Sequence, residues 1–114
     1  MDVTGNTAEY IDVDGALKRV GGNMDLYKRL LGRFSAGSDY QTLSEALESG
    51  NMEEAARLAH TIKGVTSNLS LMKIAGLSIQ LEQLIKSGSS FESCLEELKQ
   101  AFETTNSIIA EMTQ

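Results

Sequence analysis

The sequence predicts an all-α protein, an up-down four-helix bundle with a short extra helix near the N-terminus. From about residue 14 onward, apolar residues recur with helical spacing, and no stretch alternates as a half-buried strand would. Glycine and small polar residues interrupt this pattern and leave one short and several long segments. Because the connections are short, consecutive helices are expected to pack antiparallel around one core.

The first two predicted helices are residues 14 to 20 and 23 to 49. Gly22 suits the left-handed position that closes a helix, and Asn23 suits the N-cap of the next one. Apolar residues before and after Gly37 point to different sides of the second helix, so we expect a bend there or two separate helices. Ahead of them, residues 1–10 are expected to form a flexible tail on a folded domain of residues 11–114.

The three remaining helices are expected at residues 52 to 69, 71 to 87 and 90 to 113. Gly50 and Asn51 repeat the closing and capping pair before the first, and Ser70 is the expected N-cap of the second. Ser89 and Glu92 have the spacing of a capping box before the third. The last two helices each carry one apolar stripe, formed by Leu71, Ile74, Leu77, Leu81, Leu84 and Ile85, and by Phe91, Cys94, Leu95, Leu98, Phe102, Ile109 and Met112.

Composition limits the class of protein. With 114 residues, 41% of them hydrophobic and 23% charged, the chain fits one compact globular domain. Its formal net charge of −6 disfavours nucleic acid and anionic lipid, so another protein is the expected partner. The single cysteine excludes an internal disulfide, and neither a secretory leader nor a membrane-spanning run is recognisable. We therefore expect a cytoplasmic protein, and a monomer because the bundle closes its own core.

The helix at residues 52 to 69 contains the only histidine, His60. At about 100° per residue, an apolar stripe lies roughly 140° to 220° from this residue, formed by Ala55, Leu58, Ile62, Val65 and Leu69. The imidazole is therefore expected to point to solvent rather than into the core. Arg57 and Lys63 lie about 60° to either side of it.

Gly64 lies one turn beyond the histidine. Glycine inside a helix costs about 1 kcal/mol relative to alanine, and this one faces away from the core, where helix packing does not explain it. Its lack of a side chain would let another protein's loops reach Nε2 of His60. Lys63 is placed to neutralise an anion there, and a phosphoryl group is the anion that an exposed imidazole accepts covalently.

Other chemistries have less support in the sequence. A hydrolase triad lacks an orienting acid at helical spacing, because Glu53 is two turns from His60. Cys94 falls on a core stripe, so we interpret it as a packing residue rather than a catalytic one. One histidine and one buried thiol make no metal site, and we expect no cofactor or metal bound by this chain.

The segment Ala59-His60-Thr61-Ile62-Lys63-Gly64, followed by Asn68-Leu69 and Leu81-Glu82, resembles the signature of histidine-containing phosphotransfer (HPt) domains of bacterial multistep phosphorelays. The resemblance extends over about residues 11 to 100 and includes Asp14 to Asn23, Leu26-Tyr27, Phe34, Ala46-Leu47 and Ser49 to Asn51. This chain departs from the family at Ser70, where glycine is usual, and at Asn51, where aspartate is usual. Because both residues are good N-caps, we expect the helix boundaries to be unchanged.

The resemblance implies that His60 is a phosphoacceptor, which receives a phosphoryl group from an aspartyl phosphate on one receiver domain and passes it to another. Lys63 would stabilise the phosphoryl oxygens, and Gly64 would give access. The chain would be a stoichiometric carrier rather than an enzyme. Its partners would be response-regulator receiver domains and a hybrid sensor histidine kinase, and any magnesium would belong to the receiver.

A docking surface for such a partner is expected beside the histidine. Met72 and Ile79 lie on the side of their helix away from the core stripe. A small apolar centre with a polar rim is predicted from Ala56, Arg57, Ser67, Met72, Gly76, Ile79 and Gln83. The alternative is that Met72 and Ile79 are isolated exposed apolar residues, which are common and carry no function.

Two other functions compete with phosphotransfer. One is a non-phosphorylated helical adaptor that binds and inhibits a receiver domain or a kinase. The other is the dimerisation domain of a histidine kinase, which also presents a histidine on a helix. The sequence disfavours the second, since it contains no glycine-rich nucleotide loop.

Overall fold

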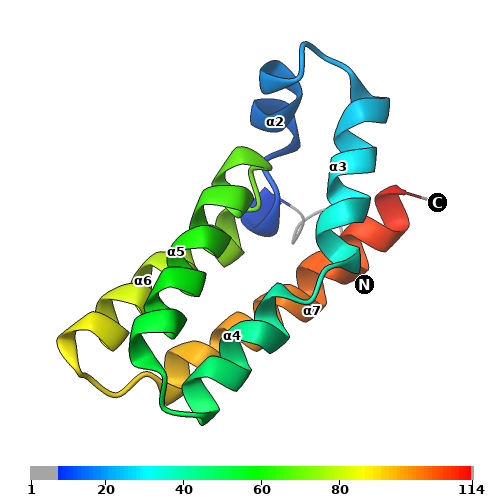
Figure 1. The fold of residues 1–114 in the computed structure, drawn as a ribbon. Helices are drawn as coiled ribbons and strands as arrows, with labels where there is room; N and C mark the ends of the chain where they lie inside the picture. The colour runs from blue at the N-terminus through cyan, green and yellow to red at the C-terminus, as the bar shows by residue number, and fades with distance from the viewer. Residues whose placement is uncertain (1–7, 114) are drawn as a thin grey trace.

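The computed structural model describes residues 8–113, which contain helices and no strand. Residues 8–10 have helical backbone, whereas residues 1–7 of the expected tail lie outside the described residues. The elements that follow are α2 (Val13–Arg19), α3 (Met24–Ala36), α4 (Asp39–Glu48), α5 (Met52–Asn68), α6 (Met72–Ser87) and α7 (Glu92–Met112). Helices α5 and α6 lie side by side, and the short α2 lies at one end (Figure 1). The predicted all-α bundle with a short N-terminal helix is confirmed.

The long helix expected over residues 23 to 49 is divided at Gly37 and Ser38. The amide of Gly37 donates to the carbonyl of Phe34 at 3.1 Å and ends α3. After the break, α4 packs against α5, while α3 packs against α7 (Figure 1). At this joint the rings of Phe34 and Phe102 stack with their centroids 5.7 Å apart. The ring centroid of Tyr40 lies 5.6 Å from that of Phe102. The change of direction lets one stretch of chain contact two neighbours and close the bundle.

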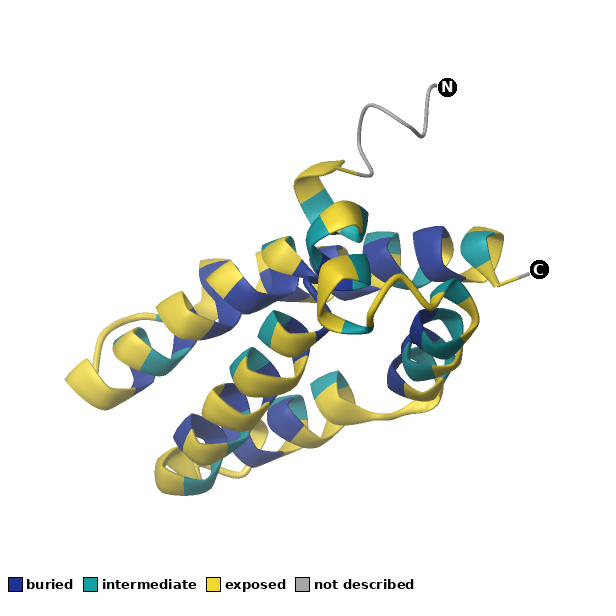
Figure 2. Cartoon of the chain, turned by 90° about the horizontal axis from the view of Figure 1, so that it is seen from above, coloured by how far each residue is buried: buried dark blue, intermediate teal, exposed yellow. Residues whose placement is uncertain are grey.

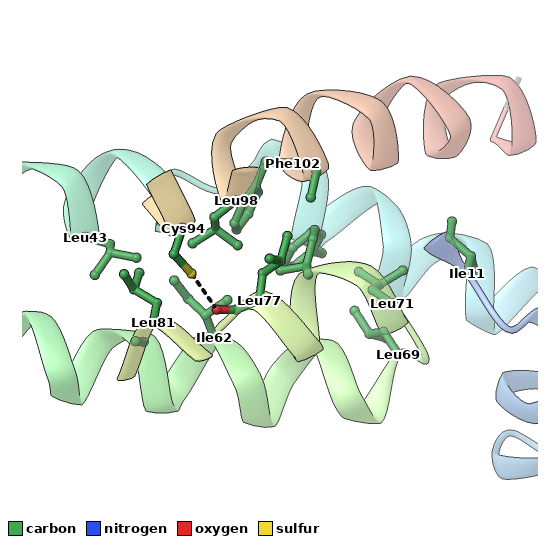
Figure 3. Packing of buried hydrophobic residues seen from close by; sticks show 14 of the residues in the cluster. Ile11, Leu43, Ile62, Leu69, Leu71, Leu77, Leu81, Cys94, Leu98 and Phe102 are labelled. Carbon is green, nitrogen blue, oxygen red and sulfur yellow. Dashed lines mark hydrogen bonds between the residues drawn. The ribbon is translucent and has the colours of Figure 1, made fainter. Parts of the chain in front are cut away.

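The core lies between the inward faces of these helices, as the burial colours in Figure 2 indicate. Cys94 is 5% exposed, and its Sγ donates to the carbonyl of Leu77 at 3.6 Å (Figure 3). Burial raises the pKa of the Cys94 thiol, which keeps it protonated. Its predicted core position is confirmed. The largest fully buried apolar side chains are Tyr27, Ile11, Leu31, Leu43, Ile62, Leu71, Ile74, Leu81, Leu98 and Ile109.

Two predicted helix junctions are confirmed. Gly22 and Gly50 have φ angles of +80° and +77°, the left-handed conformation that glycine adopts without a side-chain clash. The side chain of Asn23 accepts from the amide of Leu26 at 3.0 Å. Asn51 caps α5 in the same way, accepting from the amide of Glu54 at 3.2 Å. Asn51 therefore serves as the N-cap of the histidine helix.

The prediction that Ser70 is the N-cap of α6 is wrong. Ser70 has a φ of +59° and belongs to the end of α5. The amide of Leu71 donates to the carbonyl of Thr66 at 2.8 Å, the six-residue closure of a Schellman motif. Leu71 occupies the cap position of α6 and makes no side-chain capping bond. Ser70 thus holds a left-handed backbone position that favours glycine.

Replacing Ser70 with glycine is expected to stabilise the fold by about 1 kcal/mol, because the left-handed conformation strains a residue that carries a Cβ. The lost hydroxyl costs little, since Arg19, which donates to it at 3.3 Å, has other acceptors nearby. Urea unfolding of Ser70→Gly measures the change. The matched control is Gly50→Ser, which places a side chain at another left-handed position and is expected to lower the stability. An unchanged or lower midpoint for Ser70→Gly would contradict the expectation.

The capping box predicted before α7 is also wrong. Helix α7 begins at Glu92, whose carboxylate accepts from the amide of Phe91 at 2.9 Å. Ser89 belongs instead to the end of α6, where Gly88 is left-handed and the amide of Ser89 donates to the carbonyl of Leu84 at 3.0 Å. The hydroxyl of Ser89 also lies 2.8 Å from that of Ser87, so both its amide and its side chain are engaged at the end of α6 rather than at the start of α7.

Groups from the N-terminal third of the chain hold the turn between α5 and α6. Arg19 donates to the carbonyls of Ser67 and Asn68, the latter at 3.1 Å. The amide of Asp12 donates to the carbonyl of Ser70 at 2.9 Å. The hydroxyl of Tyr27 donates to the carbonyl of Leu69 at 2.7 Å, and burial is the main cause that raises its pKa to about 12. The carbonyl oxygens at the end of the histidine helix are therefore satisfied by residues far away in sequence.

Candidate functional site

His60 lies on α5 with its side chain 64% exposed, so the predicted outward imidazole is confirmed. The buried face of α5 is rotated from the predicted stripe toward α6. Ala55, Ile62 and Leu69 are buried as expected, but Val65 is 39% exposed and Ala56 is only 8% exposed. Alanine offers little bulk, which lets α5 and α6 pack closely along this side. As a result, His60 lies at the edge of the α5–α6 interface.

Glu82 on α6 contacts the imidazole directly. Its Oε1 lies 3.2 Å from Nδ1 of His60, and its Oε2 accepts from Nζ of Lys86 at 2.8 Å. The Glu82 side chain is 13% exposed. The hydrogen bond from Lys86, and to a lesser extent that from His60, holds the pKa of Glu82 below its ordinary value despite partial desolvation.

The contact with Glu82 decides which ring nitrogen is free. An ionised carboxylate only accepts hydrogen bonds, so Nδ1 of His60 carries the proton that it donates. In the neutral ring, Nε2 is then left with its lone pair. The geometry therefore gives an exposed imidazole whose outer nitrogen is unprotonated and able to act as a nucleophile.

The expectation that no orienting acid lies at helical spacing from His60 holds along α5, but an acid from another helix reaches the ring. That expectation considered spacing along one helix, and Glu82 comes from the neighbouring helix. The Leu81-Glu82 pair within the family resemblance was the sequence signal that could have identified it. Glu82 orients a histidine as the acid of a triad does, but no serine is hydrogen-bonded to the ring among residues 8–113.

The two predicted cations differ in their surroundings. Arg57 is exposed and donates to Glu54, with its Nε 2.9 Å from Oε1. This hydrogen bond lowers the pKa of Glu54. Lys63 is partly buried on α5, nearly one turn beyond His60. Arg57 is thus already engaged by a neighbouring carboxylate.

Gly64 is exposed in the middle of α5. A Cβ built on it would meet no atom within 4 Å, so no neighbour among residues 8–113 requires a glycine there. This agrees with the expectation that packing does not explain the residue. The surface beside the ring is open.

The surroundings of His60 include a shallow groove of about 550 Å³ between α5 and α6. Both apolar and charged side chains line it, the lining residues being Met52, Glu53, Ala56, Arg57, His60, Glu82, Ile85 and Lys86. Met52, which the sequence analysis missed, is 39% exposed. It was missed because a single apolar residue at the start of a helix gives no periodic signal.

Of the residues predicted to form a docking surface, all but one are at least partly exposed. Met72 and Ile79 are 50% and 43% exposed, as expected. Gly76, Gln83 and Arg57 are also exposed, and Ser67 is partly buried. Ala56 was predicted to belong to this surface, but it is buried because it packs toward α6.

Two further features are absent from residues 8–113. No group of three or more histidine, cysteine, aspartate or glutamate side chains there is arranged to hold a metal ion. None of the helices in that range combines the length and hydrophobicity needed to cross a bilayer.

Residues 33–108 match the Hpt domain family, which is well over half of the 114-residue chain. The chain belongs to the Hpt domain family. Hpt domains carry phosphoryl groups on a histidine in phosphorelays and interact with response-regulator receiver domains and kinases. They are carriers rather than catalysts. Searches of curated proteins and of solved structures found no significant match.

In this Hpt domain, the matched segment contains His60 and the whole of α4, α5 and α6. It also contains Glu82 and Lys86, the two residues that contact one another beside the ring. Helix α2 and most of α3 lie ahead of it. The Hpt segment therefore holds the histidine site, whereas part of the support for the α5–α6 turn comes from outside it.

Proposed function

We propose that Nε2 of His60 accepts a phosphoryl group from an aspartyl phosphate on one receiver domain and donates it to an aspartate on another. The observation that carries this proposal is the exposed imidazole with Nδ1 directed at Glu82, which leaves Nε2 open to a partner. In the forward step the phosphorus–oxygen bond of the acyl phosphate breaks, the bond from Nε2 to phosphorus forms, and the aspartate leaves as a carboxylate. The proton on Nδ1 stays between the ring and Glu82.

The remaining residues of α5 assist this step through charge and access. Phosphoryl transfer concentrates negative charge on the phosphoryl oxygens, and Lys63 is close enough in the helix to offset it. Arg57 belongs to the rim that meets the partner. Gly64 leaves room for the loops of the partner to approach the phosphorus. The magnesium ion that such a transfer uses belongs to the acidic pocket of the receiver domain, and this chain is proposed to bind no cofactor.

The partner is proposed to dock over the α5–α6 face that surrounds His60. The apolar centre of this face is formed by Met72 and Ile79, the exposed large apolar residues of α6. Gly76 and Gln83 on the same helix are also exposed, and Ser67 on α5 is partly buried. Met52 lines the groove beside His60 at the other end of the helix pair, and it takes the place of Ala56 in the proposed surface. The proposed partners are response-regulator receiver domains and a hybrid sensor histidine kinase in the cytoplasm, bound by a monomer.

Replacing both Met72 and Ile79 with glutamine is expected to slow phosphoryl transfer from a receiver domain by roughly 10-fold, because two apolar contacts are lost at the centre of the interface. Stability should change little, since glutamine is a good helix former and both positions are exposed. Transfer is followed with a radiolabelled receiver domain. The matched control is Val65→Gln, which removes a similarly exposed apolar side chain from α5 at a position outside the proposed docking face. Equal rates for the double variant and this control would end the docking proposal.

The proposed function is tested by incubating the protein with phosphorylated receiver domains. Phosphohistidine is labile in acid and stable in base, whereas an acyl phosphate is labile in base. The expected result is acid-labile, base-stable label on this chain and its loss when a second, unphosphorylated receiver is added. Binding without any transfer of label would favour the non-phosphorylated adaptor instead.

A further inference from the structure

The carboxylate of Glu82 divides its two oxygens between two partners. Oε1 lies 3.2 Å from Nδ1 of His60, and Oε2 accepts from Nζ of Lys86 at 2.8 Å. Lys86 lies one turn after Glu82 in the last turn of α6. Because each oxygen has its own partner, the orientation of the carboxylate is fixed from both sides.

Lys86 has no obvious substitute in this part of the surface. The groove beside His60 also presents Arg57, but Glu54 on its own helix engages that guanidinium. The other charged residue lining the groove from α5 is Glu53, which is acidic and cannot donate to Glu82. Without Lys86, the 13% exposed carboxylate of Glu82 would keep the imidazole as its single partner among residues 8–113. It would then be free to rotate about its terminal bond and to share both oxygens with solvent.

We propose that Lys86 is a positioning residue for phosphotransfer, which acts through Glu82 to keep the proton of the neutral imidazole on Nδ1 and the lone pair on Nε2. The tautomer of a histidine is set by the hydrogen bond that its other nitrogen makes. Free imidazole side chains favour the opposite tautomer, with the proton on Nε2, which blocks the outer nitrogen. Loosening Glu82 therefore lowers the fraction of rings that can attack phosphorus. The chemical role rests on the proposed function, whereas the effect on the tautomer does not depend on it.

The first measurement is the tautomer itself. Nitrogen-15 NMR of the ring, at a pH where it is neutral, distinguishes protonated from unprotonated Nδ1 and Nε2. Lys86→Met keeps the aliphatic stem and removes the charge, and it is expected to shift the population toward protonated Nε2. Lys86→Arg is expected to keep the wild-type population. Glu82→Ala removes the carboxylate and gives the population of a ring with no partner at Nδ1. Lys73→Met is the matched control, because Lys73 is also on α6 and pairs with Glu9 at 3.3 Å rather than with Glu82.

The second measurement is phosphorylation by phosphoramidate, a small donor that needs no docking surface. Its phosphorus–nitrogen bond breaks, the bond from Nε2 to phosphorus forms, and ammonia leaves with a proton from solvent. Lys86→Met is expected to lower the rate by roughly two- to five-fold, the range expected for the coupling of an exposed ion pair. Lys86→Arg and Lys73→Met are expected to keep the wild-type rate.

The outcomes separate this proposal from the proposed function. An unchanged tautomer population in Lys86→Met, with a clear shift in Glu82→Ala, overturns the role of Lys86. The absence of a shift in both variants overturns it as well, because the path through Glu82 would then not exist. A shift in Lys86→Met that Lys86→Arg reverses supports it, even if receiver domains fail to label the protein, a failure that counts against the proposed function alone.

Discussion

Replacing His60 with glutamine is expected to abolish the acid-labile, base-stable phosphate that the protein acquires from a phosphorylated receiver domain. An amide nitrogen has no lone pair available for attack on phosphorus, so the loss should be complete rather than partial. The measurement is radiolabel transfer, with parallel exposure of the labelled chain to acid and to base.

The His60→Gln variant should remain folded, which makes the loss interpretable. The side chain is 64% exposed, so we expect stability to change by less than about 0.5 kcal/mol. Glu82 keeps its hydrogen bond from Lys86 and is not left as an isolated charge. Urea unfolding of both proteins provides the control. Label that persists in the variant would place the acceptor on another residue and would end the assignment of His60.

Replacing Gly64 with leucine is expected to change activity and stability in opposite directions. Leucine should stabilise α5 by about 1 kcal/mol, because it is a much better helix former than glycine and a Cβ at this position meets no neighbouring atom. Transfer from a receiver domain should fall by roughly 10- to 100-fold, since a bulky side chain one turn from His60 displaces the reacting groups from their working distance. Transfer kinetics and urea unfolding measure the two effects.

Two comparisons isolate the steric cause in the Gly64→Leu variant. Phosphoramidate is small, so its rate of phosphorylating the variant should match that of the wild type. Gly32→Ala, at a glycine of α3 where a Cβ also meets nothing within 4 Å, should raise stability without slowing transfer. If Gly64→Leu accepts phosphate from receiver domains at the wild-type rate, Gly64 is not needed for a receiver domain to reach His60.

Periodicity was sufficient to predict the helices of this bundle, because long apolar stripes and left-handed glycines are local signals. Gly22 and Gly50 marked two turns correctly. Local signals failed where one residue suited two roles. Ser70 and Ser89 both have the side chain of an N-cap, yet both residues belong to the closure of the preceding helix. Which role prevails depends on the path of the turn between packed helices, and sequence spacing does not contain that path.

The outward direction of His60 could be predicted because it follows from rotation along a single helix. The exact rotation of α5 could not, since the small residues Ala56 and Ala59 give a weak hydrophobic signal and are nevertheless buried. The contact of Glu82 with the ring was missed for a related reason. It depends on the relative register of two helices, which is set by packing along their whole length.

The N-terminal residues that hold the α5–α6 turn also bear on where this domain begins. Ile11 and Tyr27 are each 1% exposed, and both precede residue 33, where the match to the family starts. A fragment trimmed to the family boundaries would remove these side chains together with Arg19 and leave several carbonyl oxygens without donors. We therefore expect the smallest unit able to fold to begin no later than residue 11, ahead of residue 33 where the family match starts.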